Sequence, residues 1–546
     1  MDDFFYLDSE IIEYYSIYQN LRMKKSFLLL IMFSVVCFMT INSVKVYGQS
    51  NDIINRIMQE GTTNSNLTQL AHELIDKIGP RLVGTPQMQQ ANDWAVQRYT
   101  DWGINARNEA WGKWKSWERG ITHMDMISPR MHTIECTQLA WSPATPKKGV
   151  TGAVVVLPDL ADSLAYSEWM KTVKGKLVMI SMPQPTGRPD DNWKEFGLKE
   201  SIDKMKKQRT AFSDAWKKRI AKTGFTNKQL MHQLETAGAA AILTSNWSSG
   251  FGVDKIFSAS TKKIPTLDVA LEDYALLYRL AESGTQPIVT LRCTSQHADP
   301  IPVYNTLAEI KGVEKPGEYV MLSAHFDSWD GATGATDNGT GTLIMMEAMR
   351  ILQKVYPNPK RTILVGHWGS EEQGLNGSRA FVEDHPEVVD HLQALFNQDN
   401  GTGRIVNISG QGFQHAGTFL SRWLSAVPDT IRNRIKTNFP GSPGGGGSDF
   451  ASFVAVGAPG FSLGALSWSY FNYTWHTNRD TYDKIVFDDL QNNALLVAML
   501  VYMAAEDPEY FPRDKAPISG NATDRNGQPI RSWPQPVKAI RLGPVE

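Results

Sequence analysis

Cysteine is scarce in this chain: three residues, Cys37, Cys136 and Cys293, occur among 546. So few thiols exclude a disulfide-rich scaffold, and they exclude a metal cluster held by thiolates. Cys37 lies in an N-terminal segment that we expect to be removed, which leaves Cys136 and Cys293. One disulfide between these two residues is neither required nor excluded by the sequence.

A surplus of charge of one sign is missing as well, because 55 Lys and Arg residues stand against 57 Asp and Glu residues. No basic tract stands out, so nothing favours nucleic acid as a partner. A chain of this length, with 42% hydrophobic residues, has ample material for a core. These features predict a folded globular protein of two or three domains.

Long apolar runs are few, and the first follows Met23 and two lysines: SFLLLIMFSVVCFMTI, with Gly48 a little further on. The order of basic, apolar and small residues is typical of a signal peptide, and the run is short for a membrane span. We therefore predict that translation starts at Met23 and that residues 1–48 are an upstream extension plus a signal peptide. The mature protein would be exported, periplasmic or secreted. An uncleaved anchor is the alternative.

The patterns along the chain predict several regions. Apolar spacing in LTQLAHELIDKI predicts helices from Asn51 to about Arg119. The short runs GAVVVL, GKLVMI, AAAILT and PIVTLRC predict a separate β-rich domain at 131–299, interrupted by a helical stretch from Lys194 to Lys228. We expect a catalytic domain in two pieces, 49–130 and 300–508, and an irregular tail at 509–546.

From residue 300 onward, strands alternate with helices. EYVMLSAH, RTILVGHWG and LQALFNQD have the composition of strands, whereas TGTLIMMEAMRILQKV and SRAFVEDH have that of helices. This alternation predicts an α/β fold with a mostly parallel central sheet flanked by helices. The later run LLVAMLVYMAA predicts a buried helix that is too short to span a membrane.

Acidic residues and histidines follow the predicted strands. In open α/β sheets, ligands bind beyond the carboxyl ends of the strands. Any one of these side chains alone would more often be a helix cap or a surface residue, but six at matching strand ends are hard to explain in that way. The six are His325, Asp337, Glu371, Glu372, Asp399 and His476.

So many acids cannot lie together without cations, because like charges raise one another's pKa. Histidine and carboxylate ligands without cysteine favour zinc, with Mn or Co as tolerable substitutes. Two metals that share one bridging carboxylate need five ligands, and a sixth carboxylate is then free to act as a base. The count therefore predicts two zinc ions, with Glu371 left over.

Three motifs that would indicate other kinds of catalytic or binding site are incomplete. HELID at His72 lacks the second histidine of the helical zinc-protease motif. GFSLG around Ser462 resembles a nucleophile elbow, but no acid lies between it and His476, so we interpret it as a strand. PGSPGGGG lacks the ending of a phosphate-binding loop, and we expect Ser448 or Asp449 behind it to cap a helix.

In combination, several motifs resemble the co-catalytic di-zinc exopeptidases that include aminopeptidases and glutamate carboxypeptidases. The resemblance covers roughly residues 70 to 505. It implies a zinc exopeptidase fold, an insert like the family's protease-associated domain, and a possible homodimer. The motifs are HFDSWDGATGATDNGTG, EEQGLNGS, NQDNGTG, HTNRDTYD, IGPRLVGT, WERG and SPRMHTI.

The resemblance also implies roles for single residues. Asp337 would bridge the two metals, His325 and Asp399 would complete one site, and Glu372 and His476 would complete the other.

Glu371 would be the general base, and Asp327 would hold the imidazole of the first ligand in place. A cis peptide bond is implied between Asp337 and Asn338. Asp330 receives no role.

The function expected is hydrolysis of dipeptides or short peptides by an exported metallopeptidase, through a water that the metals activate. An aminopeptidase on longer peptides, a metal-free receptor-like binding protein and a single-zinc glutaminyl cyclase are the alternatives. The loop Gly444–Gly447 and the stretch from Lys194 to Lys228 depart from the family, so the side-chain preference of the enzyme stays open.

Overall fold

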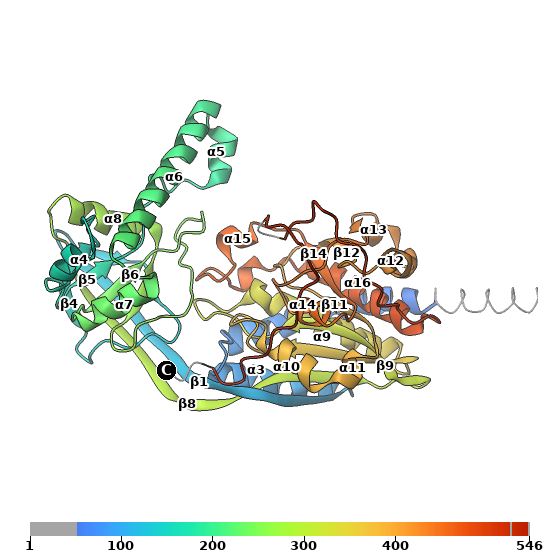
Figure 1. The fold of residues 1–546 in the computed structure, drawn as a ribbon. Helices are drawn as coiled ribbons and strands as arrows, with labels where there is room; N and C mark the ends of the chain where they lie inside the picture. The colour runs from blue at the N-terminus through green and yellow to red at the C-terminus, as the bar shows by residue number, and fades with distance from the viewer. Residues whose placement is uncertain (1–51, 525–526, 544–546) are drawn as a thin grey trace, which may run out of the picture. The chain divides into compact units, whose positions relative to one another are not determined.

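The computed structural model describes residues 52–524 and 527–543 (Figure 1). The chain divides after Gln59 into two units; the described residues of the first, 52–59, are helical, and the described residues from Glu60 onward form the compact second unit. The expected start at Met23, the signal peptide and the segment around Cys37 lie outside the described residues. No helix within the described ranges is both long and apolar enough to cross a membrane.

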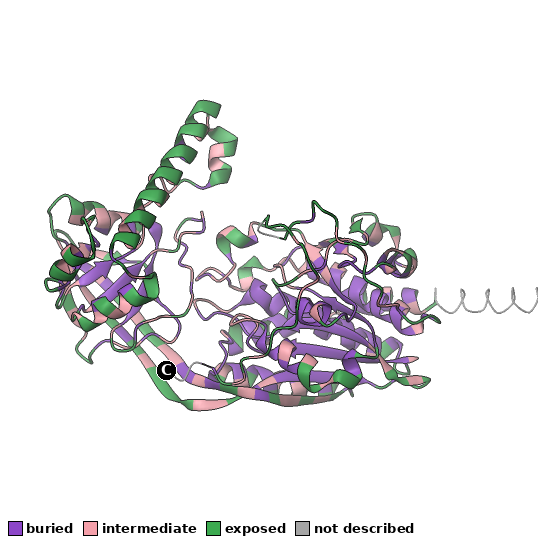
Figure 2. Cartoon of the chain, in the orientation of Figure 1, coloured by how far each residue is buried: buried purple, intermediate pink, exposed green. Residues whose placement is uncertain are grey.

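Four parallel strands form the part of the sheet that carries the predicted ligands. In spatial order they are β14 (Gly460–Ala465), β11 (Leu392–Asn397), β9 (Lys315–His325) and β10 (Arg361–Trp368). All residues of β10 and β11 are buried, as is usual for parallel strands between helical layers (Figure 2). The strands predicted from EYVMLSAH, RTILVGHWG, LQALFNQD and GFSLG are thereby confirmed.

Helices cover these strands in two groups. Helix α9 (Thr340–Val355) and helix α16 (Phe487–Glu506) pack against each other and against β9. Helix α10 (Asn376–Asp384) packs against α14 (Phe450–Ala455) and against β10. The helices predicted at 340–355, 378–385 and 495–505 are confirmed, and the fold is an α/β layer structure.

The prediction of a mostly parallel sheet is wrong, because the sheet is mixed. Strand β8 (Ile288–Ile310) lies antiparallel to β10, and β1 (Asn105–Ser128) lies antiparallel to β8 from Asn105 opposite Glu309 to Ser128 opposite Ile288. Strand β12 (Ile405–Ser409) is antiparallel to β14. The alternation of strands and helices after residue 300 predicts parallel strands only. Strand β1 lies before that region and pairs with β8, which is far away in the sequence, so the alternation gives no signal for this antiparallel pair.

The helical prediction also fails in its last part, since β1 occupies 105–128. Trp111, Trp114 and Trp117 are all buried and recur every three residues, a spacing that suggests a helix. Register shifts between Ala110 and Gly112 and after Trp114 interrupt the two-residue alternation of the strand. Bulges of this kind change which face a side chain points to, so the usual strand pattern is missing from the sequence.

The segment between β1 and β8, residues 129–287, is called the insert here. Its parallel strands are β4 (Val150–Val156), β5 (Leu177–Met179), β6 (Ala241–Thr244) and β7 (Thr266–Val269). Helices accompany them, so the insert is an α/β structure rather than the expected β-rich one. The helices are α4 (Ser163–Met170), α5 (Asp190–Phe196), α6 (Lys199–Lys222), α7 (Asn227–Thr236) and α8 (Leu271–Glu282).

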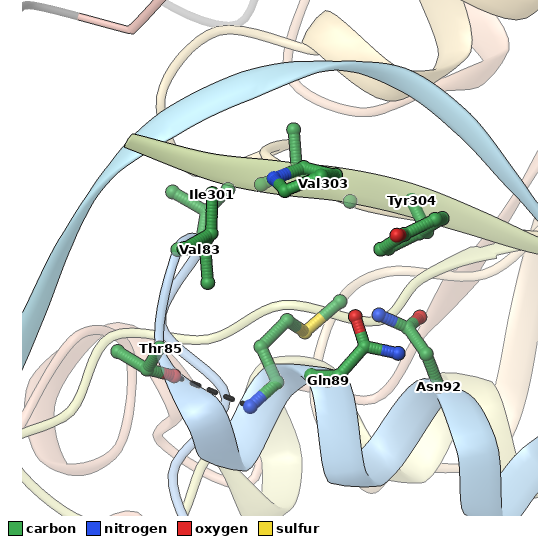
Figure 3. A pocket seen from close by; sticks show the side chains of 11 residues that line it. Val83, Thr85, Gln89, Asn92, Ile301, Val303 and Tyr304 are labelled. Carbon is green, nitrogen blue, oxygen red and sulfur yellow. Dashed lines mark hydrogen bonds between the residues drawn. The ribbon is translucent and has the colours of Figure 1, made fainter. Parts of the chain in front are cut away.

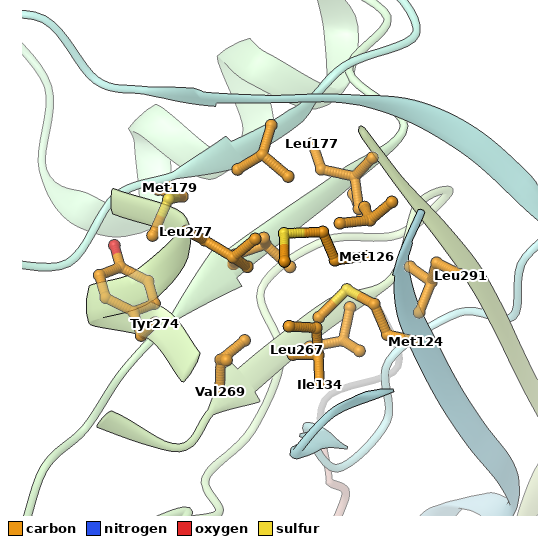
Figure 4. Close-up of a cluster of buried hydrophobic side chains, with 14 of the residues drawn as sticks. Met124, Met126, Ile134, Leu177, Met179, Leu267, Val269, Tyr274, Leu277 and Leu291 are labelled. Carbon is orange, nitrogen blue, oxygen red and sulfur yellow. The ribbon is translucent and has the colours of Figure 1, made fainter. Parts of the chain in front are cut away.

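Two long strands connect the insert with the rest of the unit. Met124 and Met126 of β1 and Leu291 of β8 pack with Met179 and Tyr274 in one buried apolar cluster of the insert (Figure 4). The other end of β8 pairs with β10, and β1 lies along β8. The charged stretch around 194–228 forms mainly α6, which is exposed along most of its length (Figure 2).

The two cysteines of the described residues, Cys136 and Cys293, are both free thiols.

Smaller strands and helices complete the described fold. The remaining elements are α2 (Leu67–Ala71), η1 (His72–Ile78), α3 (Pro86–Asp101), β2 (His132–Ile134), β3 (Cys136–Gln138), η2 (Ala335–Gly339), α11 (Pro386–Val389), α12 (Ala416–Ser425), α13 (Asp429–Arg432), β13 (Lys436–Asn438), α15 (Tyr470–Tyr473) and η3 (Tyr482–Lys484).

Candidate metal centre

The carboxyl ends of three parallel strands meet at one edge of the sheet. His325 is the last residue of β9 and lies opposite Trp368, the last residue of β10. Glu372 follows β10 after a short turn, and Asp399 follows β11. The structure thus brings side chains that are far apart in the sequence to a common edge, as the strand pattern predicted.

Two groups of potential metal ligands share one residue. His325, Asp337 and Asp399 form one group, and Asp337, Glu372 and His476 form the other; in each, the ligand atoms lie within 4.8 Å of one another. Nε2 of His325 lies 3.4 Å from Oδ1 of Asp337, and Nε2 of His476 lies 3.5 Å from Oδ2. Each oxygen of the Asp337 carboxylate therefore faces a different histidine, which is the arrangement that a bridging ligand needs.

The two groups are tight and buried. Nε2 of His325 lies 3.3 Å from Oδ1 of Asp399, and Nε2 of His476 lies 2.8 Å from Oε2 of Glu372. None of these five side chains is more than 10% exposed. Several of their atoms have no hydrogen-bond partner within the described part of the chain, namely Oδ2 of Asp337, Oε1 of Glu372 and Nδ1 of His476. Such buried donor atoms fit two divalent cations.

Charge in this cluster is far from balanced. Burial, followed by the nearby charge of Asp337, raises the pKa of Glu372 well above its usual value. Burial would lower the pKa of His325, but the carboxylates of Asp399 and Glu371 outweigh that effect and hold it well above its usual value. Both shifts express the same strongly negative potential, which bound cations would neutralise.

Glu371 lies beside this cluster without belonging to either ligand group. Its side chain is partly exposed, and the preceding Ser370 has a positive φ of 60° that turns the chain sharply after β10. Burial, then the carboxylates of Asp399 and Asp449, raise the pKa of Glu371 well above its usual value. A carboxylate of raised basicity next to a metal centre is suited to proton transfer.

Asp327 contacts the site in two ways. Nδ1 of His325 lies 3.0 Å from the main-chain oxygen of Asp327 and 3.6 Å from its carboxylate. The carboxylate itself accepts hydrogen bonds from the backbone N–H groups of Glu371, at 3.0 Å, and Glu372, at 3.3 Å. The side chain of Asp327 therefore holds the turn after β10, whereas its main-chain oxygen is the main contact to the imidazole of His325.

The bond between Asp337 and Asn338 is a cis peptide, as the resemblance implied. Asp480 holds the two residues that precede this cis bond. Its carboxylate accepts hydrogen bonds from the backbone N–H of Thr336, at 2.8 Å, and from that of Asp337, at 3.0 Å. Burial, followed by the charge of Asp337, raises the pKa of the nearby Tyr470 well above its usual value. Asp480 and Tyr470 were not among the predicted site residues, although Asp480 lies in the quoted motif HTNRDTYD.

Two arginines hold the loop between His325 and Asp337. Arg81 is fully buried and donates to the carbonyl oxygens of Phe326 at 2.8 Å and Gly334 at 2.7 Å. Arg119 forms a two-pronged ion pair with Asp330, both contacts at 2.8 Å. Asp330, left without a role by the sequence, thus ties this loop to β1. Arg81 and Arg119 come from the motifs IGPRLVGT and WERG, which carried no chemical prediction of their own.

The insert supports the ligand His476. The backbone N–H of Ile256 donates to the carbonyl oxygen of His476 at 2.7 Å, and Lys255 forms an antiparallel bridge with Thr477. The ring of Trp475 stacks on that of His476, with centroids 3.9 Å apart, and Phe257 of the insert packs edge-on against it. A ligand from the catalytic region is therefore held by residues of the insert.

Asp449 is a second carboxylate beside the base that the sequence did not reveal. Burial raises its pKa to about 7, and neither of its carboxylate oxygens has a hydrogen-bond partner among the described residues. The expected helix cap is wrong: Asp449 precedes α14 without a side-chain capping bond, and Ser448 accepts from Nδ2 of Asn397 instead. The glycine-rich run before Asp449 gives no indication in the sequence that this residue lies at the site.

A small cavity elsewhere is not a candidate site for a peptide. It lies between the start of α3 and strand β8 and is lined by residues such as Val83, Gln89 and Tyr304 (Figure 3). Its volume is about 10 Å³, enough for one water molecule at most.

Comparison with known proteins agrees with this geometry. Residues 305–501, which contain all five candidate ligands, match Peptidase family M28. This match confirms the predicted resemblance to the exopeptidase family and identifies the chain as a metallopeptidase.

Curated relatives extend the likeness beyond that segment. Carboxypeptidase Q of Bos taurus is 27% identical over 474 residues, which cover 86% of this chain and 91% of the relative. Carboxypeptidase Q of Homo sapiens is 26% identical over 463 residues, with 84% and 89% covered.

Solved structures share the fold. A peptidase M28 precursor from Shewanella amazonensis has a TM-score of 0.64 at 22% identity and covers 86% of this chain and 100% of its own. A zinc aminopeptidase from Bacillus subtilis has a TM-score of 0.52 at 19% identity, with 81% and 95% covered.

Proposed function

We propose that this metallopeptidase is a di-zinc exopeptidase that hydrolyses dipeptides or short peptides. One observation carries the proposal: the two oxygens of Asp337 face two different histidines, and each of these histidines has a further carboxylate beside it. The printed names of the relatives, carboxypeptidase Q and zinc aminopeptidase, support the reaction class and the metal.

His325 and Asp399 would hold one zinc ion, Glu372 and His476 the other, and Asp337 both. Histidine and carboxylate ligands without cysteine suit zinc. Two bound zinc ions supply Lewis acidity that polarises the scissile carbonyl and lowers the pKa of the attacking water.

Glu371 performs the proton transfers. Its carboxylate takes a proton from the water that attacks the carbonyl carbon, and the C–N bond of the resulting tetrahedral species then breaks. Glu371 passes the same proton to the leaving amine, so the carboxylate is regenerated. Asp327 keeps Glu371 and Glu372 in place through their backbone N–H groups.

The wider organisation is part of the proposal. We assign residues 49–130 and 300–508 to the catalytic domain and 509–546 to a tail. Residues 131–299, which include most of the insert and the first part of β8, are assigned to a domain of the protease-associated type. Export through the segment after Met23 rests on its basic, apolar and small residues, and homodimer formation rests on family likeness alone. N-terminal sequencing of the exported protein tests the export step: a terminus at Gln49 supports it, and a terminus before Gln49 contradicts it.

A dipeptide-library assay with zinc quantified in the same sample tests the main proposal. We expect two zinc ions per chain and cleavage of free dipeptides. Comparison of a dipeptide with its N-blocked and C-amidated forms separates the two exopeptidase classes, because an aminopeptidase tolerates the amide and a carboxypeptidase tolerates the blocked amine. A protein with one tightly bound zinc and no peptide hydrolysis would contradict the proposal and favour a cyclase.

A further inference from the structure

Helices α5 and α6 form a hairpin, residues 190–222, that protrudes from the insert. The C-terminal end of α6 lies against the strands of the insert, and α5 lies beside its other end (Figure 1). Nε1 of Trp216 anchors the first of these ends, because it donates to the carbonyl oxygen of Ile180 at 3.1 Å. Met205 is the only buried residue of α6, so most of the hairpin is exposed (Figure 2).

Two large apolar side chains project from the tip of this hairpin. Phe196 ends α5 and is 74% exposed, and Leu198, just before α6, is 73% exposed; no other large hydrophobic side chain of the described residues is as exposed. The turn between them is tight, since a β-carbon at Gly197 would lie 2.6 Å from the carbonyl oxygen of Trp193 and 3.0 Å from Ile202. Trp193 and Ile202 therefore fill the inside of the turn, and the two exposed side chains lie outside it.

The hairpin also carries a surplus of positive charge, although the net charge of the whole chain is −2. It contains ten Lys or Arg residues and six Asp or Glu residues. Four of the acids are paired within the hairpin, namely Asp190 with Arg209, Asp191 with Lys194, Asp203 with Lys199, and Asp214 with Lys217. The lysines of the hairpin that have no acidic partner in the described part of the chain are Lys204, Lys206, Lys207 and Lys218.

The apolar tip and three of these lysines lie close together along the hairpin. Lys204, Lys206 and Lys207 follow Leu198 by about 9 to 14 Å along the axis of α6. When apolar side chains enter a bilayer by about 5 to 10 Å, groups at this distance lie at the level of the lipid headgroups. Anionic headgroups attract lysines there. The order of tip and lysines thus matches the order of acyl chains and anionic headgroups.

We propose that the α5–α6 hairpin docks the protein on an anionic lipid bilayer, with Phe196 and Leu198 inserted among the headgroups and the lysines of α6 on the phosphates. A protruding tip fits a deformable lipid surface, whereas a protein partner would need a matching groove. A second copy of the chain would bring two positively charged hairpins together, which is unfavourable. Nucleic acid would use the lysines but not the exposed leucine. The inference is independent of the proposed function, because none of these residues belongs to the metal centre.

Vesicle sedimentation with the zinc-loaded, exported protein tests this inference. Vesicles of phosphatidylcholine alone are compared with vesicles that contain phosphatidylcholine and phosphatidylglycerol in equal amounts. We expect binding to the anionic vesicles that weakens as the salt concentration rises, and much weaker binding to the neutral vesicles. Equal binding to both kinds of vesicle, or binding to neither, would overturn the inference.

A double variant tests the apolar tip. Phe196→Ser with Leu198→Ser should lower the partition onto anionic vesicles about 10- to 100-fold, because the apolar area that enters the bilayer is lost. Leu164→Ser, at a residue of α4 that is 72% exposed, is the matched control and should bind as the wild type does. Unchanged binding of the double variant would overturn the inference. A double variant that elutes as a smaller particle than the wild type would also overturn it, because a second copy would then cover the tip.

A second double variant tests the charge. Lys204→Gln with Lys207→Gln should lower the partition onto anionic vesicles about 10- to 30-fold, because two lysines at the headgroup level are lost. The control is Lys147→Gln with Lys148→Gln, at two exposed lysines elsewhere in the insert. An equal loss in both pairs would show that total charge, and not the hairpin, drives binding, which would overturn the inference.

A fluorescence measurement reports insertion of the tip directly. A polarity-sensitive dye on Phe196→Cys should shift its emission to the blue when anionic vesicles are added, and the same dye on Leu164→Cys should not. Wild type treated with the dye corrects for labelling of the native cysteines. A dye at the tip that shows no shift would overturn the inference, even where another segment holds the chain on the vesicles.

Discussion

The catalytic end of the sheet and the insert each bury several carboxylates, but the groups that surround those carboxylates differ. At the sheet end, Asp337 and Glu372 have oxygens without hydrogen-bond partners among the described residues, and two histidines face them. In the insert, Asp268 accepts hydrogen bonds from the hydroxyl of Thr244 at 2.9 Å and from the backbone N–H of Lys255 at 3.1 Å.

In the described part of the insert, Oδ1 of Asp254 also lacks a hydrogen-bond partner, but no group of three potential metal ligands surrounds the pair Asp254 and Asp268. Asp254 and Asp268 are both fully buried; burial raises the pKa of Asp268 to about 7 and that of Asp254 well above its usual value. Within the described chain, no potential metal group of three His, Cys, Asp or Glu residues includes either of them. Buried acids alone do not indicate a metal centre; unpartnered oxygens that converge with imidazole nitrogens do.

The largest expected effect concerns the base at the sheet end. Glu371→Gln should lower kcat for dipeptide hydrolysis about 10³-fold, because the amide cannot accept the proton of the attacking water. The zinc content should stay unchanged, since Glu371 belongs to neither ligand group. Steady-state kinetics with zinc analysis check both points, and Glu314→Gln, at an exposed glutamate, is the control. Retained activity would refute the role of Glu371.

A second prediction tests the shared ligand. Asp337→Asn should weaken both zinc sites, whereas Asp399→Asn should weaken only the site of His325. After dialysis against a weak chelator, elemental analysis should find the first variant with almost no zinc and the second with about one ion per chain, because each site loses affinity only when its own carboxylate is replaced. Equal losses in the two variants would contradict a bridging role for Asp337.

The smallest effect is expected in the insert, as a change in the pH dependence of stability. The folded-state pKa of Asp268, about 7, lies above its ordinary value of 3.8, so its protonated form stabilises the fold below about pH 4, and that contribution is lost as the pH rises to 7. The stability difference between wild type and Asp268→Asn should shrink by roughly 1.4 kcal/mol per pH unit across this range.

Urea unfolding at pH 5, 6 and 7, with zinc present throughout, measures that difference. Asp299→Asn, at an exposed position, serves as the control. A difference that does not change with pH would show that Asp268 stays ionised in the fold. Zinc content should be the same in both proteins, and a loss of zinc in Asp268→Asn would remove the contrast between the two regions.

Much of the candidate site could be predicted because its signals are local. Each of the strands β9, β10 and β11 contains a short apolar run. His325 ends β9, Glu371 and Glu372 follow β10 after a short turn, and Asp399 lies two residues beyond β11. Parallel strands place their carboxyl ends at one edge, so the sequence order was enough to bring these residues together.

The sequence by itself determined the strands and helices after residue 300 and the residues at their ends, because the hydrophobic periodicity that predicts them depends only on neighbouring residues. Only the tertiary structure decided that β1 pairs with β8, that Arg81, Arg119 and Asp480 hold the loop around Asp337, and that Lys255 forms a bridge with Thr477. Each of these features joins residues more than 100 positions apart. Such contacts depend on how the whole chain packs, and no local pattern records them.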